Sequence, residues 1–145
     1  MINPLGGKTG SKPYKRRILV VEDEEDAANV FKTLIETGGN FEVDIALDGK
    51  KALDMQRIGR YDLVLLDIIM PIMDGIETLK VLKENPEVYG TPIVLMLTNL
   101  TGEMAEESVK KYKADGYIVK IDTEPEKLLQ KIKEALPETS EKVMQ

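Results

Sequence analysis

Short apolar runs that alternate with helical stretches constrain the fold of this 145-residue chain more than any other feature. Most of the runs are uniformly apolar, as strands buried on both faces of a parallel sheet are. One run alternates apolar with acidic residues, which indicates an edge strand with one wetter face. The pattern predicts an α/β fold, a doubly wound parallel sheet with helices on both faces. The predicted strands are ILVV (18–21), FEVDIA (41–46), DLVLL (62–66), TPIVLML (91–97) and GYIV (116–119).

Five helices are predicted to follow these strands in turn. Thr37-Gly38-Gly39 ends the first helix, and Asp48-Gly49 opens the second. Asp74 is expected to cap the third helix, and Thr123 with Glu126 forms a capping-box pattern before the last. The helices are predicted near residues 27–35, from residue 49, and at 75–84, 103–113 and 124–136.

Composition excludes several kinds of site. The chain has no Cys and no His, so it lacks thiolate ligands, the commonest general base and the commonest metal ligand. A net charge of -6 argues against a nucleic-acid surface. The basic cluster KPYKRR (12–17) is interpreted as a solvated lead-in to the first strand, with a basic contact surface as the alternative. No apolar run is long enough to cross a membrane and no signal pattern opens the chain, so a cytoplasmic protein is expected.

The length suits a single domain with its own core. Residues 1–14 are rich in Gly, Pro and Ser and predict a flexible N-terminal arm. The domain is expected to span residues 15–137, and residues 138–145 to form a short tail. That tail is too short for a second domain, so no output module is expected on this chain.

Polar residues stand where four of the predicted strands end. Ligands of open parallel sheets bind beyond the carboxyl ends of the strands. The first strand ends in Glu22 and Asp23, the third in Asp67, the fourth in Thr98 and the fifth in Lys120. The sequence therefore offers three carboxylates, one hydroxyl and one ammonium to the edge of the sheet where ligands bind.

Over roughly residues 16–136 the chain resembles the receiver domains of bacterial two-component response regulators. The resemblance is carried by ILVVEDE, LVLLDIIMPIMDG, LMLT and GYIVK, in that order and spacing. It implies a flavodoxin-like fold with strand order 2-1-3-4-5 and five surrounding helices. The first and third strands are neighbours in that order, so Glu22, Asp23 and Asp67 would converge.

The resemblance implies that Asp67 accepts a phosphoryl group from a phosphohistidine of a sensor histidine kinase or phosphotransfer protein. Asp23, Asp67 and the backbone carbonyl of Ile69 would bind Mg²⁺, and Glu22 would act through water. Because neighbouring carboxylates repel and Mg²⁺ prefers oxygen ligands, an acidic site without His suits this ion better than zinc. The chain would then be a phosphoacceptor signalling domain rather than an enzyme.

The same resemblance implies a conformational switch. Lys120 and Thr98 would share with the ion the task of neutralising the phosphoryl oxygens. In the family, the hydroxyl at the position of Thr98 moves towards the phosphoryl group, and the ring at the position of Tyr117 turns inward. This would change the face formed by the last two helices and the last strand, where a downstream effector protein would bind.

Each of these residues also has an ordinary structural interpretation. Asp67 taken alone is a turn acid after a strand, Lys120 a solvated lysine at a strand end, and Tyr117 a half-buried strand aromatic. Residues 24–26 are interpreted as an acidic first helical turn, which the helix dipole favours. The ordered set of motifs favours the functional interpretation for the other residues.

The chain departs from the family pattern at Ile121 and Asn99, and it has Ile69 and Leu100 at two positions that vary within the family and influence hydrolysis of the aspartyl phosphate. Ile121 stands where proline usually follows the lysine, so a trans peptide is expected there and the reach of Lys120 becomes less certain. Asn99 replaces a smaller residue and is expected to narrow access to the phosphoryl site. Ile69 and Leu100 offer no hydrogen bond to an attacking water, which predicts a long-lived phosphorylated state.

Three other interpretations stay open. A receiver-like scaffold would bind partners without phosphorylation. The domain could also be cut from a larger hybrid kinase or regulator. A Mg²⁺-dependent phosphatase would need a second acid two residues after its nucleophile, where this chain has Ile69.

Overall fold

The computed structural model describes residues 15–68, 74–100, 102–120 and 124–136. Its strands form one parallel sheet in the order β2-β1-β3-β4-β5. The parallel sheet and its strand order are as expected, and the strand with the alternating sequence lies at an edge. The strands are β1 (Arg16–Val21), β2 (Phe41–Ala46), β3 (Leu63–Asp67), β4 (Ile93–Thr98) and β5 (Gly116–Val119).

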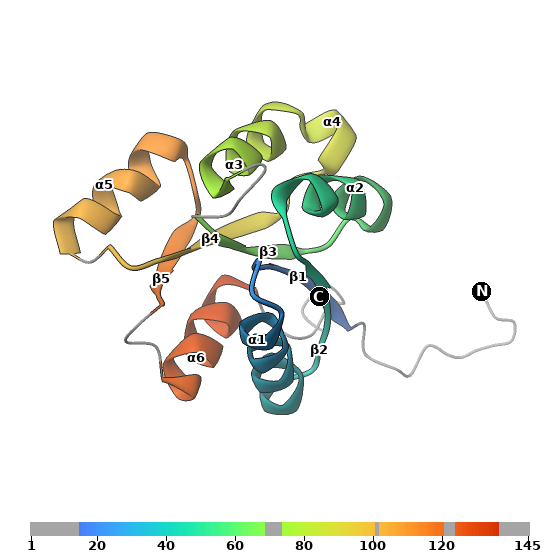
Figure 1. Cartoon of the computed structure of the whole chain (residues 1–145), viewed down its shortest axis with the longest axis vertical. Helices are drawn as coiled ribbons and strands as arrows, with labels where there is room; N and C mark the ends of the chain where they lie inside the picture. The colour runs from blue at the N-terminus through green and yellow to red at the C-terminus, as the bar shows by residue number, and fades with distance from the viewer. Residues whose placement is uncertain (1–14, 69–73, 101, 121–123, 137–145) are drawn as a thin grey trace, which may run out of the picture.

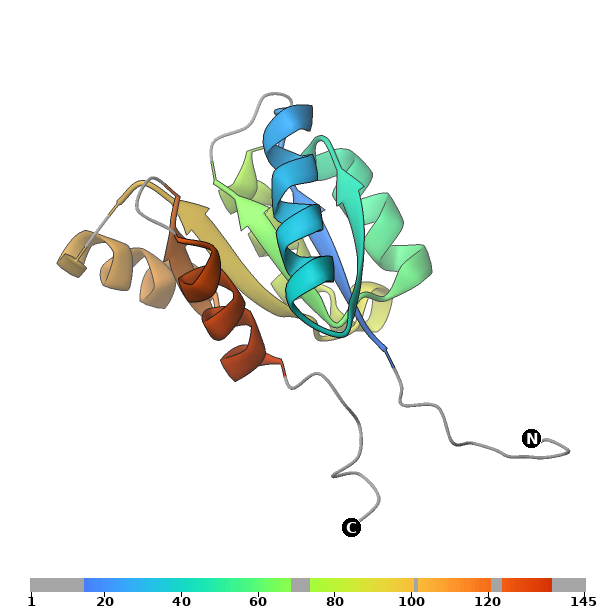
Figure 2. The same cartoon turned by 90° about the horizontal axis from the view of Figure 1, so that it is seen from below.

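Helices cover both faces of the sheet, in a doubly wound arrangement (Figure 1). The helices in the described residues are α1 (Glu25–Gly38), α2 (Gly49–Gly59), α3 (Gly75–Glu84), α4 (Pro86–Tyr89), α5 (Gly102–Tyr112) and α6 (Pro125–Ala135). Helices α1 and α6 lie on one face, as the view in Figure 2 shows, and the other four lie on the opposite face.

The described residues contain one helix more than the five predicted. The additional helix, α4, is a single turn, and Pro86 at its start has a backbone conformation already suited to a first helical position. A four-residue turn is shorter than the window over which helical periodicity can be recognised.

Successive side chains along a strand point to opposite faces, so the sheet has an apolar core on each face. Ile18 and Val20 of β1 pack under α1 and α6, whereas Leu19 and Val21 pack under the helices of the other face. All four side chains are completely buried. Full burial of an aliphatic side chain of this size contributes about 1.5 to 3 kcal/mol, so the central strands form a rigid base for the residues at their ends.

Two of the predicted helix caps, Asp48 and Asp74, are present in the described residues. The Asp48 carboxylate accepts a hydrogen bond from the backbone N–H of Lys51 at 2.8 Å, and the Asp74 carboxylate accepts one from that of Glu77 at 2.9 Å. Helix α6 instead has Glu124 as its N-cap, without a side-chain cap hydrogen bond, and Pro125 as its first residue. The N-cap is thus one residue later than predicted. Thr123, on which the predicted capping box depends, lies outside the described residues.

Gly75 lets the start of α3 lie directly against the end of β3. Its N–H donates a hydrogen bond to the carbonyl of Ile68 at 2.8 Å. A Cβ at this position would lie 2.6 Å from the Cα of Ile68 and closer still to the carbonyl oxygen of Asp67. Both neighbours are backbone atoms, so only glycine fits here without displacing the chain that carries Asp67.

Candidate functional site

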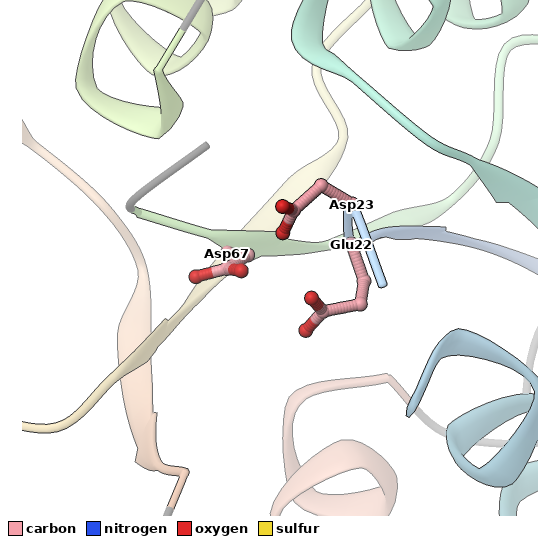
Figure 3. Close-up of side chains that lie close together, drawn as sticks. All are labelled: Glu22, Asp23 and Asp67. Atoms are coloured by element: carbon pink, nitrogen blue, oxygen red, sulfur yellow. The ribbon is translucent and has the colours of Figure 1, made fainter. Parts of the chain in front are cut away.

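Three carboxylates meet beyond the C-terminal ends of β1 and β3. The two strands are paired with Val21 opposite Leu66, so the residues that follow β1 lie beside the last residue of β3. Glu22, Asp23 and Asp67 each present one carboxylate oxygen, and these oxygens lie within 4.8 Å of one another. Figure 3 shows the three side chains directed towards a shared space.

The three acids differ in their access to solvent. Glu22 is fully buried and Asp67 is 4% exposed, whereas Asp23 is exposed. Asp23 therefore lies at the mouth of the site, and Asp67 lies at the boundary between the core and the cleft. Burial places Glu22 at the base of the group.

Lys120, the residue after β5, reaches across the site to two of the acids. Its ammonium nitrogen lies 3.0 Å from Oδ2 of Asp67 and 3.0 Å from Oε1 of Glu22. Burial alone lowers the pKa of Lys120, but the two carboxylates outweigh this effect, and the pKa of Lys120 is raised overall. Its backbone N–H also donates to the carbonyl of Thr98 at 2.7 Å, which fixes the start of the side chain beside β4.

The surroundings of Glu22 disfavour the charged form of its carboxyl group. Burial raises the pKa of its carboxyl group and repulsion from Asp67 adds to the rise, while Lys120 and the N–H of Glu24 oppose it. The Glu24 N–H donates to Oε2 of Glu22 at 3.2 Å. The other oxygen, Oε1, is buried and accepts no hydrogen bond from the described residues, although it lies in the ion pair with Lys120.

The donor set fits a hard divalent cation. Three carboxylates face one ammonium in the described residues, so negative charge is in excess at the site. The available ligands are oxygens, and the chain has no His or Cys to favour a softer metal. The buried Oε1 of Glu22, 3.0 Å from the Lys120 ammonium, is also placed to accept a hydrogen bond from a metal-bound water.

A cleft of about 550 Å³ opens above these groups. Thr98 lies in its wall, 7% exposed, and its hydroxyl accepts a hydrogen bond from the N–H of Leu100 at 3.0 Å. Asn99 and Leu100 are both exposed at the cleft. The residues that line the cleft are Glu22, Asp23, Glu24, Asp67, Ile68, Leu97, Thr98, Asn99, Leu100 and Lys120.

Five of the predicted site residues line this cleft together: Glu22, Asp23, Asp67, Thr98 and Lys120. Tyr117 does not line it; this residue lies on β5, half-buried against the layer under α5. Ile69 and Ile121 lie outside the described residues, so the predicted carbonyl ligand and the predicted trans peptide stay predictions.

Sequence reasoning missed two contributions to the site. Glu24 was interpreted only as part of an acidic helical turn, yet its N–H holds the Glu22 carboxylate. Ile68 lines the cleft and accepts the hydrogen bond from Gly75. The Asp-Gly pair at 74–75 was the available signal for the second contact, because glycine after a helix cap often marks a close approach of two backbone segments.

Comparison with known proteins identifies the family. The model of the response regulator receiver domain matches residues 18–133. The response regulator ArlR of Staphylococcus saprophyticus is 36% identical over 104 residues, which cover 72% of this chain and 45% of that protein. The transcriptional regulatory protein CpxR of Escherichia coli is 38% identical over 104 residues, covering 72% of this chain and 42% of that protein. The chain thus spans less than half the length of these two relatives.

A shorter relative and solved structures agree with this result. The polar-differentiation response regulator DivK of Brucella anthropi is 33% identical over 105 residues, covering 72% of this chain and 84% of that protein. The chemotaxis response regulator CheY4 of Vibrio cholerae superposes with a TM-score of 0.76 at 28% identity, covering 85% of this chain and all of that one.

A CheY-like receiver domain protein of Methanospirillum hungatei gives a TM-score of 0.71 at 29% identity, with 83% of this chain and 93% of that one covered. None of the described helices has the length and apolar character needed to span a bilayer. From the family match, the relatives, the strand order and the acidic cleft, the chain belongs to the response regulator receiver domains, a family of signalling domains.

Proposed function

We propose that this receiver domain accepts a phosphoryl group on Asp67 from a phosphohistidine of a partner kinase or phosphotransfer protein. The observation that supports the proposal most strongly is the position of Asp67. Its carboxylate lies at the end of a buried strand, next to two other acids and 3.0 Å from the Lys120 ammonium. A nucleophile for phosphoryl transfer needs a fixed position and nearby positive charge, and this arrangement supplies both.

In the proposed step, a carboxylate oxygen of Asp67 attacks phosphorus while the bond from phosphorus to the imidazole nitrogen of the donor breaks. The nitrogen keeps the bonding electron pair and takes a proton from solvent, and Asp67 becomes an acyl phosphate. Lys120 then exchanges its ion pair with Asp67 for contact with a phosphoryl oxygen. The Thr98 hydroxyl, now bonded to the N–H of Leu100, turns towards a second oxygen.

Asp23, Asp67 and the backbone carbonyl of Ile69 would hold Mg²⁺ in this cleft, with Glu22 acting through a bound water. When bound, the ion supplies positive charge to the phosphoryl oxygens. The buried position of Glu22 suits an outer role, because its two oxygens are already directed to Lys120 and the Glu24 N–H. Asp23, being exposed, suits a direct ligand that solvent and ion can reach.

The signal is proposed to leave the cleft through Thr98 and Tyr117. Thr98 ends β4, and Tyr117 lies on β5 opposite Met96, so the two residues belong to adjacent strands. Movement of the Thr98 hydroxyl would free space into which the Tyr117 ring turns. The face formed by α5, β5 and α6 would then change, and an effector protein would bind it with altered affinity.

Intact-protein mass spectrometry with a small phosphodonor tests the phosphoacceptor proposal. Acetyl phosphate and Mg²⁺ should add one phosphoryl group to the wild-type chain and none to Asp67→Asn. The matched control is Asp74→Asn, because Asp74 is an exposed helix cap and Asn is an equally good capping residue. Omitting Mg²⁺ should strongly reduce the uptake in the wild type and in the control.

The scaffold alternative makes a different prediction in the same experiment. A receiver-like scaffold would show no phosphoryl uptake in the wild type, yet would bind its partner equally with and without acetyl phosphate. Equal uptake by Asp67→Asn and the wild type would show that another residue is modified, and would contradict the proposed role of Asp67.

A further inference from the structure

Lys131 of α6 lies against Tyr117 of β5 in two ways. Its ammonium nitrogen lies 3.2 Å from the backbone carbonyl oxygen of Tyr117, to which it donates a hydrogen bond. The same nitrogen lies 5.0 Å from the centre of the Tyr117 ring, within the distance at which a cation is attracted to an aromatic face. One lysine therefore contacts both the backbone and the ring of the same tyrosine.

The hydrogen bond from Lys131 to the Tyr117 carbonyl lies at the open edge of the sheet. β5 pairs with β4, and the N–H of Lys120 points to β4, where it donates to Thr98. Backbone groups of a strand alternate in direction, so the carbonyl of Tyr117 points away from β4. Figure 1 shows β5 at this edge, between α5 on one face and α6 on the other. Lys131 thus reaches around the strand from the α6 face.

The Tyr117 ring lies on the face of the sheet opposite to α6. It packs, half-buried, against the core layer that contains Met96, the layer against which Val109 and Tyr112 of α5 also pack. Thr98 follows Met96 by two residues in the same strand, so its side chain points to the same face as the Tyr117 ring. A ring that leaves the edge and moves along this face would move towards the end of β4.

The hydrogen bond to the carbonyl and the attraction to the ring depend differently on the orientation of the Tyr117 ring. The hydrogen bond to the carbonyl holds the Lys131 ammonium at the edge whichever way the ring points, because the backbone does not move with χ1. The attraction to the ring exists only while the ring lies under the ammonium. A contact shifts a conformational equilibrium only by its difference between the two states, and this contact is present in one state alone.

We propose that Lys131 is a positioning residue that holds the Tyr117 ring at the sheet edge and so sets the threshold for the switch. This inference rests on the proposed function, in which the ring turns inward when Asp67 is phosphorylated. Removing the ammonium favours the inward ring, and the activated state then forms at a lower concentration of the activating ligand. The expected effect is about two- to fivefold, which corresponds to the strength of a cation–aromatic contact at an exposed site.

The test uses the full chain with 3-fluorotyrosine at its five tyrosines and beryllofluoride with Mg²⁺ as the activating ligand. Tyr117→Phe assigns the fluorine signal of residue 117. The variant is Lys131→Met, which keeps the length of the side chain and removes its charge. Lys131→Arg keeps a cation over the ring and serves as the conservative rescue. Lys127→Met, at an exposed lysine one turn earlier on α6, is the matched control for lost charge.

The inference predicts a changed resting signal for residue 117 in Lys131→Met, and a beryllofluoride midpoint lowered about two- to fivefold. Lys131→Arg and Lys127→Met should both keep the wild-type signal and midpoint. A wild-type response with the same midpoint in Lys131→Met would overturn the inference and leave the proposed function intact. A wild type that does not respond to beryllofluoride would overturn the proposed function, and the inference with it.

Discussion

Gly75→Ala is expected to destabilise the domain and displace the phosphoacceptor together. The new Cβ would lie 2.6 Å from the Cα of Ile68, 3.0 Å from the carbonyl carbon of Asp67, and nearer still to its oxygen. Backbone atoms at the end of a buried strand cannot swing aside as a side chain can. The start of α3 must therefore move away from β3, and the hydrogen bond from Gly75 to Ile68 lengthens or breaks.

The expected loss in the free energy of unfolding of Gly75→Ala has three contributions. Overpacking a rigid site costs about 1 to 3 kcal/mol, and backbone neighbours place this case near the upper end. Weakening the hydrogen bond costs about 0.5 to 1.5 kcal/mol. The lower entropy of the unfolded chain with alanine offsets about 0.4 to 1 kcal/mol. The free energy of unfolding should therefore fall by about 2 to 3 kcal/mol.

Urea unfolding followed by far-ultraviolet circular dichroism measures this loss. With a slope of about 1 to 3 kcal/mol per molar urea, the midpoint should fall by roughly 0.7 to 3 M. Gly102→Ala is the control, because its φ of 60° disfavours alanine while a Cβ there would meet nothing within 4 Å. That strain alone costs about 1 kcal/mol. A Gly75→Ala variant as stable as Gly102→Ala would refute the argument from steric contact.

Three further predictions concern other parts of the molecule. Leu100→Glu should shorten the lifetime of the phosphorylated state, because a carboxylate at the cleft can orient an attacking water; a wild-type lifetime of seconds, measured as loss of the phosphoryl mass, would contradict the premise. Burial, with the hydrogen bond to Asp44, raises the pKa of Tyr61 to about 12. Because the folded pKa exceeds the unfolded value, the stability from this hydroxyl is complete below pH 10 and is lost as the pH rises to about 12; Tyr61→Phe should remove this loss from a plot of urea midpoint against pH, and an unchanged plot would argue against it. Buried Gln56 donates to the carbonyls of two tyrosines, so Gln56→Glu should cost more than about 2 kcal/mol, whereas exposed Gln130→Glu should change the urea midpoint little.

The sequence predicted the sheet well because its central strands are uniformly apolar. Runs such as those ending at Val21 and Leu66 are buried on both faces, and their short length favours a strand over a helix. The order of the strands was not deducible from periodicity and came from the family resemblance. Given that order, the meeting of Asp23 with Asp67 follows from which strands are neighbours.

Details that depend on packing were not predictable in the same way. The sequence places Glu22 at a strand end, where a solvated side chain and a buried one are equally compatible with the pattern. In the structure it is fully buried, with the Lys120 ammonium 3.0 Å from its Oε1. The reach of Lys120 was expected to be uncertain because Ile121 replaces proline, yet its ammonium contacts Asp67 at 3.0 Å. The contact between Lys131 and Tyr117 joins residues on opposite faces of the sheet, and no local pattern indicates it.

The central claim is that Asp67 itself carries the phosphoryl group. After treatment with acetyl phosphate and Mg²⁺, borohydride reduces an aspartyl phosphate to homoserine, and peptide sequencing by mass spectrometry locates the new residue. The account predicts homoserine at position 67 and aspartate at positions 23 and 74. Homoserine at another position, or unmodified aspartate at position 67 in protein that has gained a phosphoryl group, would contradict it.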